Sequence, residues 1–370
     1  MKIPRGLASR RDFIRQITLG GAVLSSGLAV PRLLADTAPA KRPLGVALLG
    51  LGTYASYQLA PALQMTKLCR LTGAISGHPA KLEHWKKQYG LPDKNCYGYE
   101  QLDQIADNKD IDIVYVVTPN TLHRDFVVRA AKAGKHVICE KPMGGNVADC
   151  EAMIAACQAA KVRLSVGYRM HFDPYMKELM RLQREKDFGD FKKLNGNFSF
   201  VFGQHAWRVE KKLAGGGPLM DIGIYVIQAA CMAVGSTPIA ATAKELPKDR
   251  PDFFVDVEEA LSFQLEFANG AVLEAGTSYN DYQNRFRAEG DKGWIDFSDN
   301  AFSYQVGQVN TSRGALSYRC PSQQALQMDD FADCILTGRP SEVDGEMGRR
   351  DMRIIGAIYE ASRTGKKVSI

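Results

Sequence analysis

Three short stretches carry side chains whose types and spacing suit proton-transfer chemistry. The first is E-K-P at 140–142, directly after an apolar run of strand length. The second is "AGGGPLMDIGIYVI" at 214–227, where Asp221 and Tyr225 are four residues apart. On a helix that spacing places both side chains on one face. The third is Y-R at 168–169, which ends another predicted strand. Ammonium, carboxylate and phenol groups are typical of general acid–base catalysis.

The first half of the chain must position these groups, and its pattern alternates strands with helices. Apolar runs of strand length occur at 44–49, 69–77, 111–120, 136–142 and 162–169, with helical segments between them. This alternation predicts an α/β fold with an N-terminal Rossmann domain, a doubly wound parallel sheet. Ligands bind outside the carboxyl ends of the strands in such sheets, where the residues at 140–142 are expected.

A glycine-rich turn follows the first predicted strand and reads G-x-G-x-x-A. Gly50 permits a tight bend, Gly52 lets backbone approach a pyrophosphate, and Ala55 is small enough for helix to pack on strand. The helix start then offers free N–H groups and a partial positive charge. The strand–turn–helix setting therefore predicts a dinucleotide site that includes Gly50, Gly52, Thr53 and Tyr54.

The end of the second predicted strand distinguishes between cofactors. An enzyme for NAD usually has an acidic residue there, on the ribose 2′-hydroxyl. This chain has "SGHPAK" at 76–81 instead, so no acid repels a 2′-phosphate, and Ser76 and Lys81 can bind one. We therefore expect NADP rather than NAD. The competing interpretation is that Lys81 is only a solvated helix lysine.

The second half has a different sequence pattern, in which apolar residues occur at every second position. Leu261, Phe263, Leu265 and Phe267 alternate with other residues and lead into Asn269-Gly270, which predicts an antiparallel hairpin. We expect a C-terminal α+β domain with a large, open, mostly antiparallel sheet, one face of which packs on helices. The other face is expected to be aromatic and apolar, so the chain is predicted to form a homo-oligomer, a dimer or tetramer, through this sheet.

The N-terminus resembles an export signal. Arg10-Arg11 precede an uncharged stretch from Gln16 to Pro31, which is shorter and weaker than a membrane span. The twin arginines are typical of the route that exports folded proteins to the periplasm. We expect a signal peptide at 1–40, with cleavage at 35–40, a Rossmann domain at 41–165 and a substrate and oligomerisation domain at 166–370. The alternative is an amphipathic N-terminal helix.

Charge and composition exclude several classes of function. Residues 1–35 contain six of the basic and one of the acidic side chains, so the net charge of +6 leaves +1 on the rest. A nearly neutral protein gives no support to nucleic-acid binding or stable membrane association. The six histidines are scattered without ligand spacing, so no metal is expected. The eight cysteines form no C-x-x-C pair, and most should be free and buried.

These motifs together resemble the Gfo/Idh/MocA oxidoreductase family, and within it the periplasmic glucose–fructose or aldose–aldose oxidoreductases. The likeness rests on E-K-P at 140–142, "TPNTLH" at 118–123, "GYR" at 167–169 and "WRVEKKLAGGGPLMDIGIY" at 207–225. It extends from about residue 44 to the C-terminus. Such enzymes are expected to extend further at the C-terminal end than this sequence, which ends at Val368-Ser369-Ile370.

The resemblance implies roles for the residues. Many family members pair aspartate with histidine, and Tyr225 stands in the histidine position here. A phenol, with a pKa near ~10, needs a nearby cation to act as a base. The resemblance therefore implies Tyr225 as acid/base, Lys141 as its electrostatic partner and Asp221 as the anchor for a sugar hydroxyl. The alternative is that Tyr225 is a core residue. Substrate is expected to contact Lys141, Tyr168, Asp221 and Tyr225.

The remaining cofactor contacts are also implied by resemblance. His123 is expected to contact cofactor or substrate, with capping of a strand–helix turn as the open alternative. Trp207 and Arg208 are expected to line the pocket. The full set beyond the glycine turn, Ser76 and Lys81 is Pro119, Asn120, His123, Glu140, Lys141, Arg169, Trp207 and Arg208.

The resemblance also explains why a nucleotide enzyme would be exported. Tightly bound, non-dissociating NADP would be reduced by one sugar, an aldose oxidised at C1 to its lactone. A second sugar, fructose or another aldose, would reoxidise it and become an alditol, a ping-pong cycle. Alternatives are an aldose dehydrogenase with exchanging NADP, an NAD-dependent glycosidase, and a non-catalytic sugar sensor. The glycosidase motif has a histidine where this chain has "GGGPL".

Overall fold

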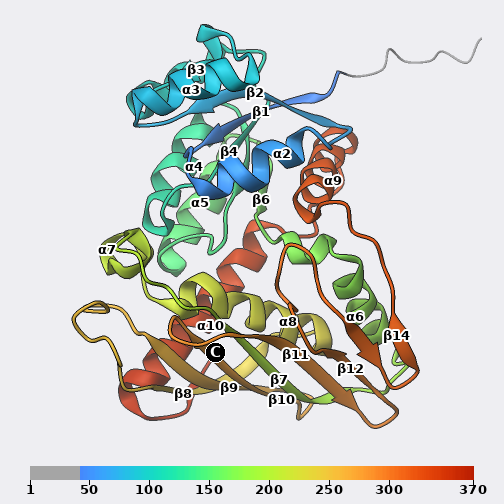
Figure 1. Ribbon diagram of the computed structural model, residues 1–370. Coiled ribbons are helices and arrows are strands. Elements are labelled where there is room, and N and C mark those ends of the chain that lie inside the picture. Colours follow the sequence, from blue (N-terminus) through green and yellow to red (C-terminus); the bar gives the residue numbers. More distant parts are fainter. Residues whose placement is uncertain (1–41) are drawn as a thin grey trace, which may run out of the picture. The chain divides into compact units, whose positions relative to one another are not determined.

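The computed structural model describes residues 42–370. The predicted twin-arginine signal and its cleavage at 35–40 lie outside the described residues. Figure 1 shows two layered regions, a parallel sheet wrapped by helices and a larger sheet with helices on one face. Both expected halves of the α/β fold are therefore present.

The first sheet has six parallel strands in the order β3-β2-β1-β4-β5-β6. This is the doubly wound arrangement that the alternating pattern predicts. All six residues of the central strand β1 are buried, as expected of a strand covered by helices on both faces. The strands are β1 (Leu44–Leu49), β2 (Cys69–Ile75), β3 (Cys96–Tyr97), β4 (Ile113–Val116), β5 (His136–Cys139) and β6 (Leu164–Val166).

Helices link these strands in the order expected from the sequence. The short strand β3, which the sequence analysis does not predict, pairs with the end of β2. The connecting elements are η1 (Ala55–Leu59), α2 (Ala60–Leu63), α3 (Pro79–Tyr89), η2 (Asp93–Asn95), η3 (Tyr99–Asp107), η4 (Asn120–Leu122), α4 (His123–Lys132) and α5 (Val147–Ala159).

The second sheet has nine strands in the order β14-β13-β12-β11-β7-β10-β9-β8-β15. Neighbours are antiparallel except β7 and β10, which run parallel. The predicted hairpin is confirmed, with Gly270 at its turn at φ +83°. The strands are β7 (Phe191–Ser199), β8 (Pro238–Glu245), β9 (Ala260–Phe267), β10 (Val272–Ser278), β11 (Gln283–Gly290), β12 (Trp294–Phe297), β13 (Val309–Thr311), β14 (Gly314–Leu316) and β15 (Val368–Ser369).

Helices α6 (Pro174–Glu185), α8 (Ile224–Val234) and α10 (Gly345–Thr364) lie on one face of the nine-stranded sheet (Figure 1). The last helix, α10, ends at Gly365 in the left-handed conformation, φ +67°, as the sequence predicts. The elements are η5 (Arg169–Phe172), α6 (Pro174–Glu185), η6 (Trp207–Val209), α7 (Lys211–Ala214), η7 (Leu219–Gly223), α8 (Ile224–Val234), α9 (Gln323–Thr337) and α10 (Gly345–Thr364).

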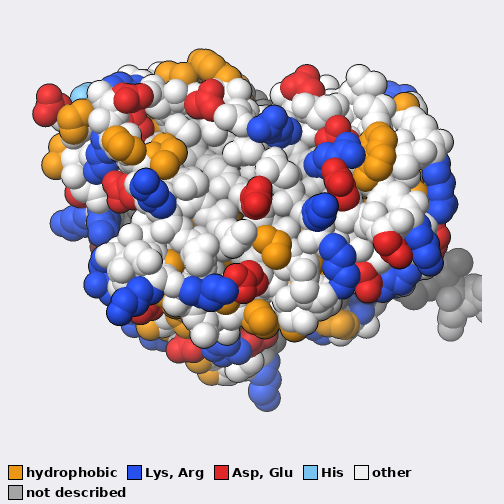
Figure 2. Space-filling model, turned by 90° about the horizontal axis from the view of Figure 1, so that it is seen from below, with side chains coloured by type: hydrophobic (Ala, Val, Ile, Leu, Met, Phe, Trp, Pro, Cys, Tyr) orange, Lys and Arg blue, Asp and Glu red, His pale blue; other side chains and the backbone are white. Residues whose placement is uncertain are grey.

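The face of the sheet away from these helices is polar, which corrects the expectation of an aromatic and apolar surface. One row of cross-strand neighbours is fully apolar and buried: Ala241, Leu265, Leu273, Leu194, Ala288 and Ile295. The adjacent row, which points the other way, is Thr242, Gln264, Glu274, Asn195, Arg287 and Asp296. Figure 2 views the molecule from this side and shows charged and polar groups around scattered apolar ones. The alternating apolar residues therefore all serve the helix-covered face.

Helix α8 is the centre of the second half. Ten of its eleven residues are buried, and the helical stretch Lys211–Val234 has a mean hydropathy of 1.5 over its most apolar window. It is the one helix in the described part of the chain that is long and apolar enough to cross a membrane. Because 94% of that window is buried inside the protein, its composition is that of a core helix.

Helix α9 returns to the first half. Its residues Ala325, Met328 and Phe331 are buried in one cluster with Leu48 of β1 and Leu59 of η1. The residues after 166 therefore do not form a separate unit, since one of their helices completes the core beneath the glycine-rich turn.

Candidate functional site

The glycine-rich turn between β1 and η1 has the geometry of a dinucleotide site. Gly50 has φ +100°, and a side chain there would lie 2.5 Å from the carbonyl oxygen of Val117. Only glycine fits such a position. A side chain at Gly52 would meet no atom within 4 Å, so this backbone faces open space. Thr53 is exposed and Tyr54 half-buried beside it. The four residues expected at the turn thus border one opening.

The end of β2 fits a cofactor that carries a 2′-phosphate. Ser76 is buried, and its Oγ accepts a hydrogen bond from the amide of His78 at 3.1 Å. Lys81 is exposed in the first turn of α3, where the partial positive charge of the helix start also favours an anion. Residues 76–81 contain no carboxylate. The local charge is therefore positive, as binding of a phosphate requires.

Glu140, at the end of β5, is held inside the protein. Its Oε1 accepts a hydrogen bond from the hydroxyl of Tyr115 at 2.7 Å, and its Oε2 one from the amide of Lys141 at 3.1 Å. Burial raises the pKa of Glu140. A side chain at Gly167 would overlap this carboxylate, with Oε1 at 2.4 Å. Glu140 thus contacts the carboxyl ends of β4, β5 and β6. These contacts fix the position of the Lys141 backbone, from which the lysine side chain extends.

Lys141 and Asp221 form an ion pair, a contact that the sequence analysis does not predict. The Lys141 Nζ donates to the backbone oxygen of Asp221 at 2.6 Å and lies 3.4 Å from its Oδ1. The Asp221 Oδ2 accepts from Arg208 Nε at 3.0 Å and from the Tyr279 hydroxyl at 2.8 Å. Burial disfavours the charge on Asp221, but Arg208 and Lys141 outweigh it and lower the pKa of this carboxyl. Asp221 is therefore an anion held between two cations.

Tyr225 presents its ring to two cations. The Lys141 Nζ lies 4.8 Å and the Arg169 Cζ 4.9 Å from the ring centroid. The ring also packs edge-on against Phe198, with centroids 5.7 Å apart. Tyr225 is half-buried. Its ring is thus held between two cations and an aromatic side chain.

Arg169 is almost fully buried, 3% exposed, at the start of η5. Its guanidinium donates to the backbone oxygen of Phe302 at 2.6 Å and of Ser303 at 3.1 Å, and to the side-chain oxygen of Gln323. The ring of Tyr304 lies over it at 4.6 Å. Arg169 therefore belongs to the catalytic cluster more directly than to the nucleotide turn.

Tyr304 closes this cluster from the side of the first half. Its ring stacks on Tyr54 of the glycine turn, with centroids 6.1 Å apart and planes at 28°. Burial raises the pKa of Tyr304 to about 12. The order Tyr54, Tyr304, Arg169, Tyr225 forms one layered column from the nucleotide turn to the expected base. The site is thus built jointly by both halves.

The loop 204–209 supplies the two remaining residues expected at the pocket. Arg208 lies with its guanidinium 4.4 Å over the ring of Trp207, and both side chains are half-buried. Because Arg208 also binds Asp221, Trp207 is held next to the charged cluster. Both residues therefore lie beside Asp221, and their contact with the cofactor stays a prediction.

The strand end at 118–120 joins the two halves. Asn120 is buried, and its Nδ2 donates to the backbone oxygen of Ala214 at 2.8 Å. Pro119 precedes it and is half-buried. Thr121 donates to the oxygen of Lys212 at 2.8 Å. Asn120 thus uses its amide to hold the "AGGGPL" segment rather than leaving it free for a ligand.

His123 departs from the expected contact with cofactor or substrate. It is fully buried, with Nδ1 at 3.0 Å from the carbonyl oxygen of Pro142 and Nε2 at 2.9 Å from that of Thr118. Burial lowers the pKa of His123. Both ring nitrogens are occupied by backbone, so this histidine braces the turn that carries Lys141. The capping alternative describes it better.

Tyr168 likewise turns away from the expected substrate position. It is 4% exposed, its ring lies 6.2 Å from that of His171, and its hydroxyl is buried without a hydrogen-bond partner in the described chain. Tyr168, two residues after the end of β6, thus faces the core, whereas Arg169, at the start of η5, points to the cluster.

Sequence reasoning missed four residues of the site. Tyr279 and Gln323 bind Asp221 and Arg169 directly, Tyr304 covers Arg169, and Gln327 donates to Tyr115 at 3.3 Å. Each lies at least 50 residues from its partner, and none belongs to a recognisable motif. The strand-end position of Tyr279, directly after β10, is the only local signal that points to it.

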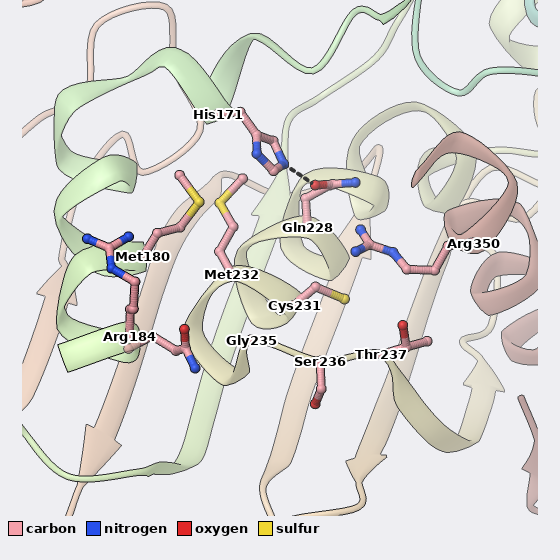
Figure 3. A pocket seen from close by; sticks show the side chains of 11 residues that line it. His171, Met180, Arg184, Gln228, Cys231, Met232, Gly235, Ser236, Thr237 and Arg350 are labelled. Atoms are coloured by element: carbon pink, nitrogen blue, oxygen red, sulfur yellow. Dashed lines mark hydrogen bonds between the residues drawn. The ribbon is translucent and has the colours of Figure 1, made fainter. Parts of the chain in front are cut away.

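A hollow of the second half lies elsewhere, at the other end of α8. Figure 3 shows His171, Gln228 and Arg350 converging beside Cys231, Met232, Gly235 and Ser236. Its volume is about 460 Å³, and none of the predicted site residues lines it.

The described residues hold no further cofactor signal. No group of three or more His, Cys, Asp or Glu residues that could hold a metal ion occurs between Arg42 and Ile370. All eight cysteines are free, six of them buried, as expected. Burial raises the pKa of thiols such as Cys69 and Cys157, so these are inert core residues.

Comparison with known proteins identifies the family. Residues 44–168 match the family described as "Oxidoreductase family, NAD-binding Rossmann fold", and residues 176–296 match the GFO/IDH/MocA C-terminal domain. A D-xylose 1-dehydrogenase [NADP(+)] of Haloarcula marismortui is 28% identical over 343 residues, which cover 89% of this chain and 93% of that relative.

Solved structures agree with this assignment. The aldose-aldose oxidoreductase from Caulobacter crescentus, complexed with glycerol, is 43% identical with a TM-score of 0.86, covering 89% of this chain and 100% of that one. A levoglucosan dehydrogenase in complex with NADH and levoglucosan has a TM-score of 0.78 at 22% identity, covering 89% and 100%, and shows the shared fold. The chain therefore belongs to the Gfo/Idh/MocA family of oxidoreductases, with a Rossmann domain for a nicotinamide dinucleotide and the C-terminal domain of that family.

Proposed function

We propose that the protein is an NADP-containing sugar oxidoreductase. It oxidises an aldose at C1 to the lactone and reduces a second sugar, another aldose or fructose, to an alditol. The similarity to the Caulobacter crescentus aldose-aldose oxidoreductase, at 43% identity over 89% of the chain, supports this reaction. The observation that carries it is the Tyr225 phenol, set beside Lys141 and Arg169.

The residues of the cluster divide the work. Tyr225 takes the proton from the C1 hydroxyl of the aldose and returns it to the second sugar. Lys141, anchored on Asp221, orients the sugar oxygen, and Asp221 with Arg208 and Tyr279 fixes the ammonium in place. Bound NADP supplies the hydride acceptor and, once reduced, the hydride donor. Acid–base assistance of this kind contributes about 10²–10⁴-fold in rate.

The cofactor is NADP rather than NAD. The D-xylose dehydrogenase of Haloarcula marismortui is named for NADP(+), and residues 76–81 of this chain have a lysine and no acid. Replacing Lys81 with Ala should weaken NADP binding about tenfold and leave NAD binding unchanged, as loss of one charged hydrogen bond implies. Lys87→Ala, on the same helix, is the matched control. Equal affinities for NADP in both variants would contradict the assignment.

Product analysis with pairs of sugars and no added nucleotide tests the coupled reaction. Glucose with a second aldose or fructose should yield lactone and alditol in equal amounts from the purified protein. Neither product should form with Tyr225→Phe. Lactone formation only after addition of free NADP would instead reveal a dehydrogenase.

That dehydrogenase, an NADP-dependent aldose enzyme with exchanging cofactor, is the second candidate. The similarity to the D-xylose 1-dehydrogenase over 93% of that relative favours it. Gel filtration separates the candidates, because a retained cofactor stays with the protein and an exchanging one is lost. Complete loss of nucleotide together with full activity on re-addition would favour the second.

Location and assembly complete the proposal. We place the enzyme in the periplasm, from the twin arginines and uncharged stretch in residues 10–31. Its polar sheet face is the proposed interface of a homo-oligomer. Asn195→Arg, at the centre of the polar row, should reduce the mass measured by analytical ultracentrifugation, whereas Lys87→Glu on α3 should not. An unchanged mass with Asn195→Arg would exclude this interface.

A further inference from the structure

We infer that Arg169, rather than Lys141, is the cation that stabilises the ionised form of Tyr225. This inference rests on the proposed function, because it concerns the base of that reaction. It assigns Arg169 a positioning role in acid–base chemistry instead of a role in holding the cofactor.

The charges of the cluster show why Lys141 is the weaker candidate. Its ammonium lies 2.6 Å from the backbone oxygen and 3.4 Å from Oδ1 of Asp221. Arg208 shares the same carboxylate at 3.0 Å. An ammonium already paired with an anion exerts a much smaller field on a third group. The positive charge of Lys141 is therefore largely committed before Tyr225 ionises.

Arg169 has no such partner. No carboxylate of residues 42–370 lies within 4.0 Å of its guanidinium nitrogens; its acceptors are two carbonyls, the Gln323 amide and a thioether sulfur. These satisfy donors without cancelling charge. Its Nε is buried and has no hydrogen-bond partner within the described chain. A guanidinium stays charged in proteins, so Arg169 keeps its positive charge inside the site.

The charged guanidinium of Arg169 lies next to the ring of Tyr225. The guanidinium carbon is 4.9 Å from the ring centroid of Tyr225 and 4.6 Å from that of Tyr304. An opposite charge nearby favours the charged form of an ionisable group. The other charged or titratable groups around Tyr225 are Lys141, Asp221, Tyr304, Tyr54 and Glu140. Among the cations facing this ring, Arg169 is the one without an anion.

Arg250 shows how this protein treats an arginine with a structural role. It too lies over two aromatic rings, Phe253 at 5.4 Å and Phe254 at 4.9 Å, and binds two carbonyls. Unlike Arg169, it is paired with a carboxylate, Glu259 at 2.9 Å. Glu259 neutralises the charge of Arg250, whose role is therefore structural. Arg169 has similar aromatic and carbonyl neighbours but no such carboxylate in the described chain, so its charge is not neutralised in this way.

The test measures the ionisation of Tyr225 itself. Ultraviolet difference titration of the NADP-loaded protein, with Tyr225→Phe as the blank, reports the pH at which this phenol ionises. Arg169→Gln should raise that pH by one unit or more, Arg169→Lys by less, and Lys141→Met by less than Arg169→Gln. Arg250→Gln is the matched control and should leave the titration unchanged. The acidic limb of the pH profile of kcat/KM for sugar oxidation should move with the titration.

Several outcomes would overturn the inference. An unchanged titration in Arg169→Gln, or a larger shift in Lys141→Met, would return the role to Lys141. Loss of bound NADP with an unchanged titration would make Arg169 a cofactor ligand. If Arg169→Gln does not fold, a shift above one unit in Lys141→Met alone still rejects the inference. If sugars are not turned over but the titration shifts as expected, the inference stands and the proposed reaction fails.

Discussion

Helix α8 connects two buried polar clusters, and the two differ in how their charges are balanced. At its start, Tyr225 faces Lys141 and Arg169, and Asp221 lies between Lys141 and Arg208. One turn later, Gln228 links His171 to Asp351 (Figure 3 shows His171, Gln228 and Arg350). We call these the catalytic cluster and the core cluster.

The polar side chains of the core cluster bind one another. His171 Nε2 lies 2.7 Å from Gln228 Oε1, Gln228 donates to Asp351, and Asp351 accepts from Arg350 Nε at 2.8 Å. The one anion thus meets one cation. In the catalytic cluster Lys141 and Arg208 share Asp221, and Arg169 has no carboxylate of the described residues within 4.0 Å, so positive charge remains for a ligand or an ionised phenol.

This difference separates a structural from a functional polar cluster. A buried pair that cancels its own charge stabilises one arrangement and has nothing left to offer a substrate. A buried cluster with uncompensated charge lowers the stability of the folded state, and interactions elsewhere in the protein offset this cost. Such clusters are typical of active sites. The charge balance therefore favours the catalytic cluster as the functional one.

Removing the hydroxyl of Tyr225 should give the largest effect. Tyr225→Phe keeps the ring contacts with Phe198 and the two cations, but removes the proton carrier, so kcat should fall about 10²–10⁴-fold. Steady-state kinetics with pairs of sugars measure this, and the absorbance of bound nucleotide provides the control. Turnover within tenfold of wild type would show that Tyr225 is a core residue.

Removing one cation from each cluster should sharpen the contrast. Arg350→Met leaves Asp351 buried without its partner and should lower the free energy of unfolding by about 3 kcal/mol. Lys141→Met leaves Asp221 its bonds with Arg208 and Tyr279, so stability should change by less than about 1 kcal/mol while activity is lost. Urea denaturation of both variants provides the comparison. Equal destabilisation would mean that both clusters are structural.

The core cluster should also respond to acid. Burial lowers the pKa of His171 to about 4, below the ~6.5 of an unfolded histidine. The unfolded state therefore binds more protons between these values, and stability falls as the pH drops below about 6.5. Between pH 7 and 5.5 the loss should be about 1.4 kcal/mol at most.

The variant His171→Gln retains a donor for Gln228 and removes the titrating ring. Its stability should therefore decline less than that of wild type over the same pH interval, as thermal unfolding would show. Parallel pH curves for the two proteins would rule out this contribution. The difference between the proteins is the measured quantity, because buried carboxyls such as Asp351, whose pKa burial raises, act in the opposite direction.

The smallest effect is expected at Tyr168, the tyrosine that faces the core cluster. Its hydroxyl has no hydrogen-bond partner in the described chain, so Tyr168→Phe should change stability by less than about 0.5 kcal/mol and leave kcat unchanged. It is the natural control for Tyr225→Phe. A tenfold loss of kcat would restore the expected contact of Tyr168 with substrate.

Much of the first half follows from local sequence. The alternation of buried strands and helices predicts the order of elements, and G-x-G-x-x-A predicts the nucleotide turn because Gly50 must adopt φ +100°. The spacing of Asp221 and Tyr225 predicts that both lie on one face of a helix. These features depend on residues close together in the chain, where backbone geometry and helical periodicity decide the outcome.

Features that join distant segments were not predictable in this way. Period two shows which residues of a strand share a face, but not which face a helix will cover, so the outer face was expected to be apolar and is polar. Tyr168 and Arg169 were both assigned to the site, although only Arg169 points to it. Helix α9 packs beneath β1, far from it in sequence.

By itself, the sequence determined the fold class and the nucleotide turn and singled out Lys141, Asp221 and Tyr225 as candidates for the site, since each depends on a short motif. Tertiary structure alone decided that Arg169 would lie between Tyr225 and Tyr304, that Tyr279 would hold Asp221, and that His123 would brace a turn. The physical reason is that the charge balance around a buried group is set by all side chains close to it in space, which come from distant parts of the sequence. Whether a buried cation is neutralised depends on every chain segment within about 4 Å of it.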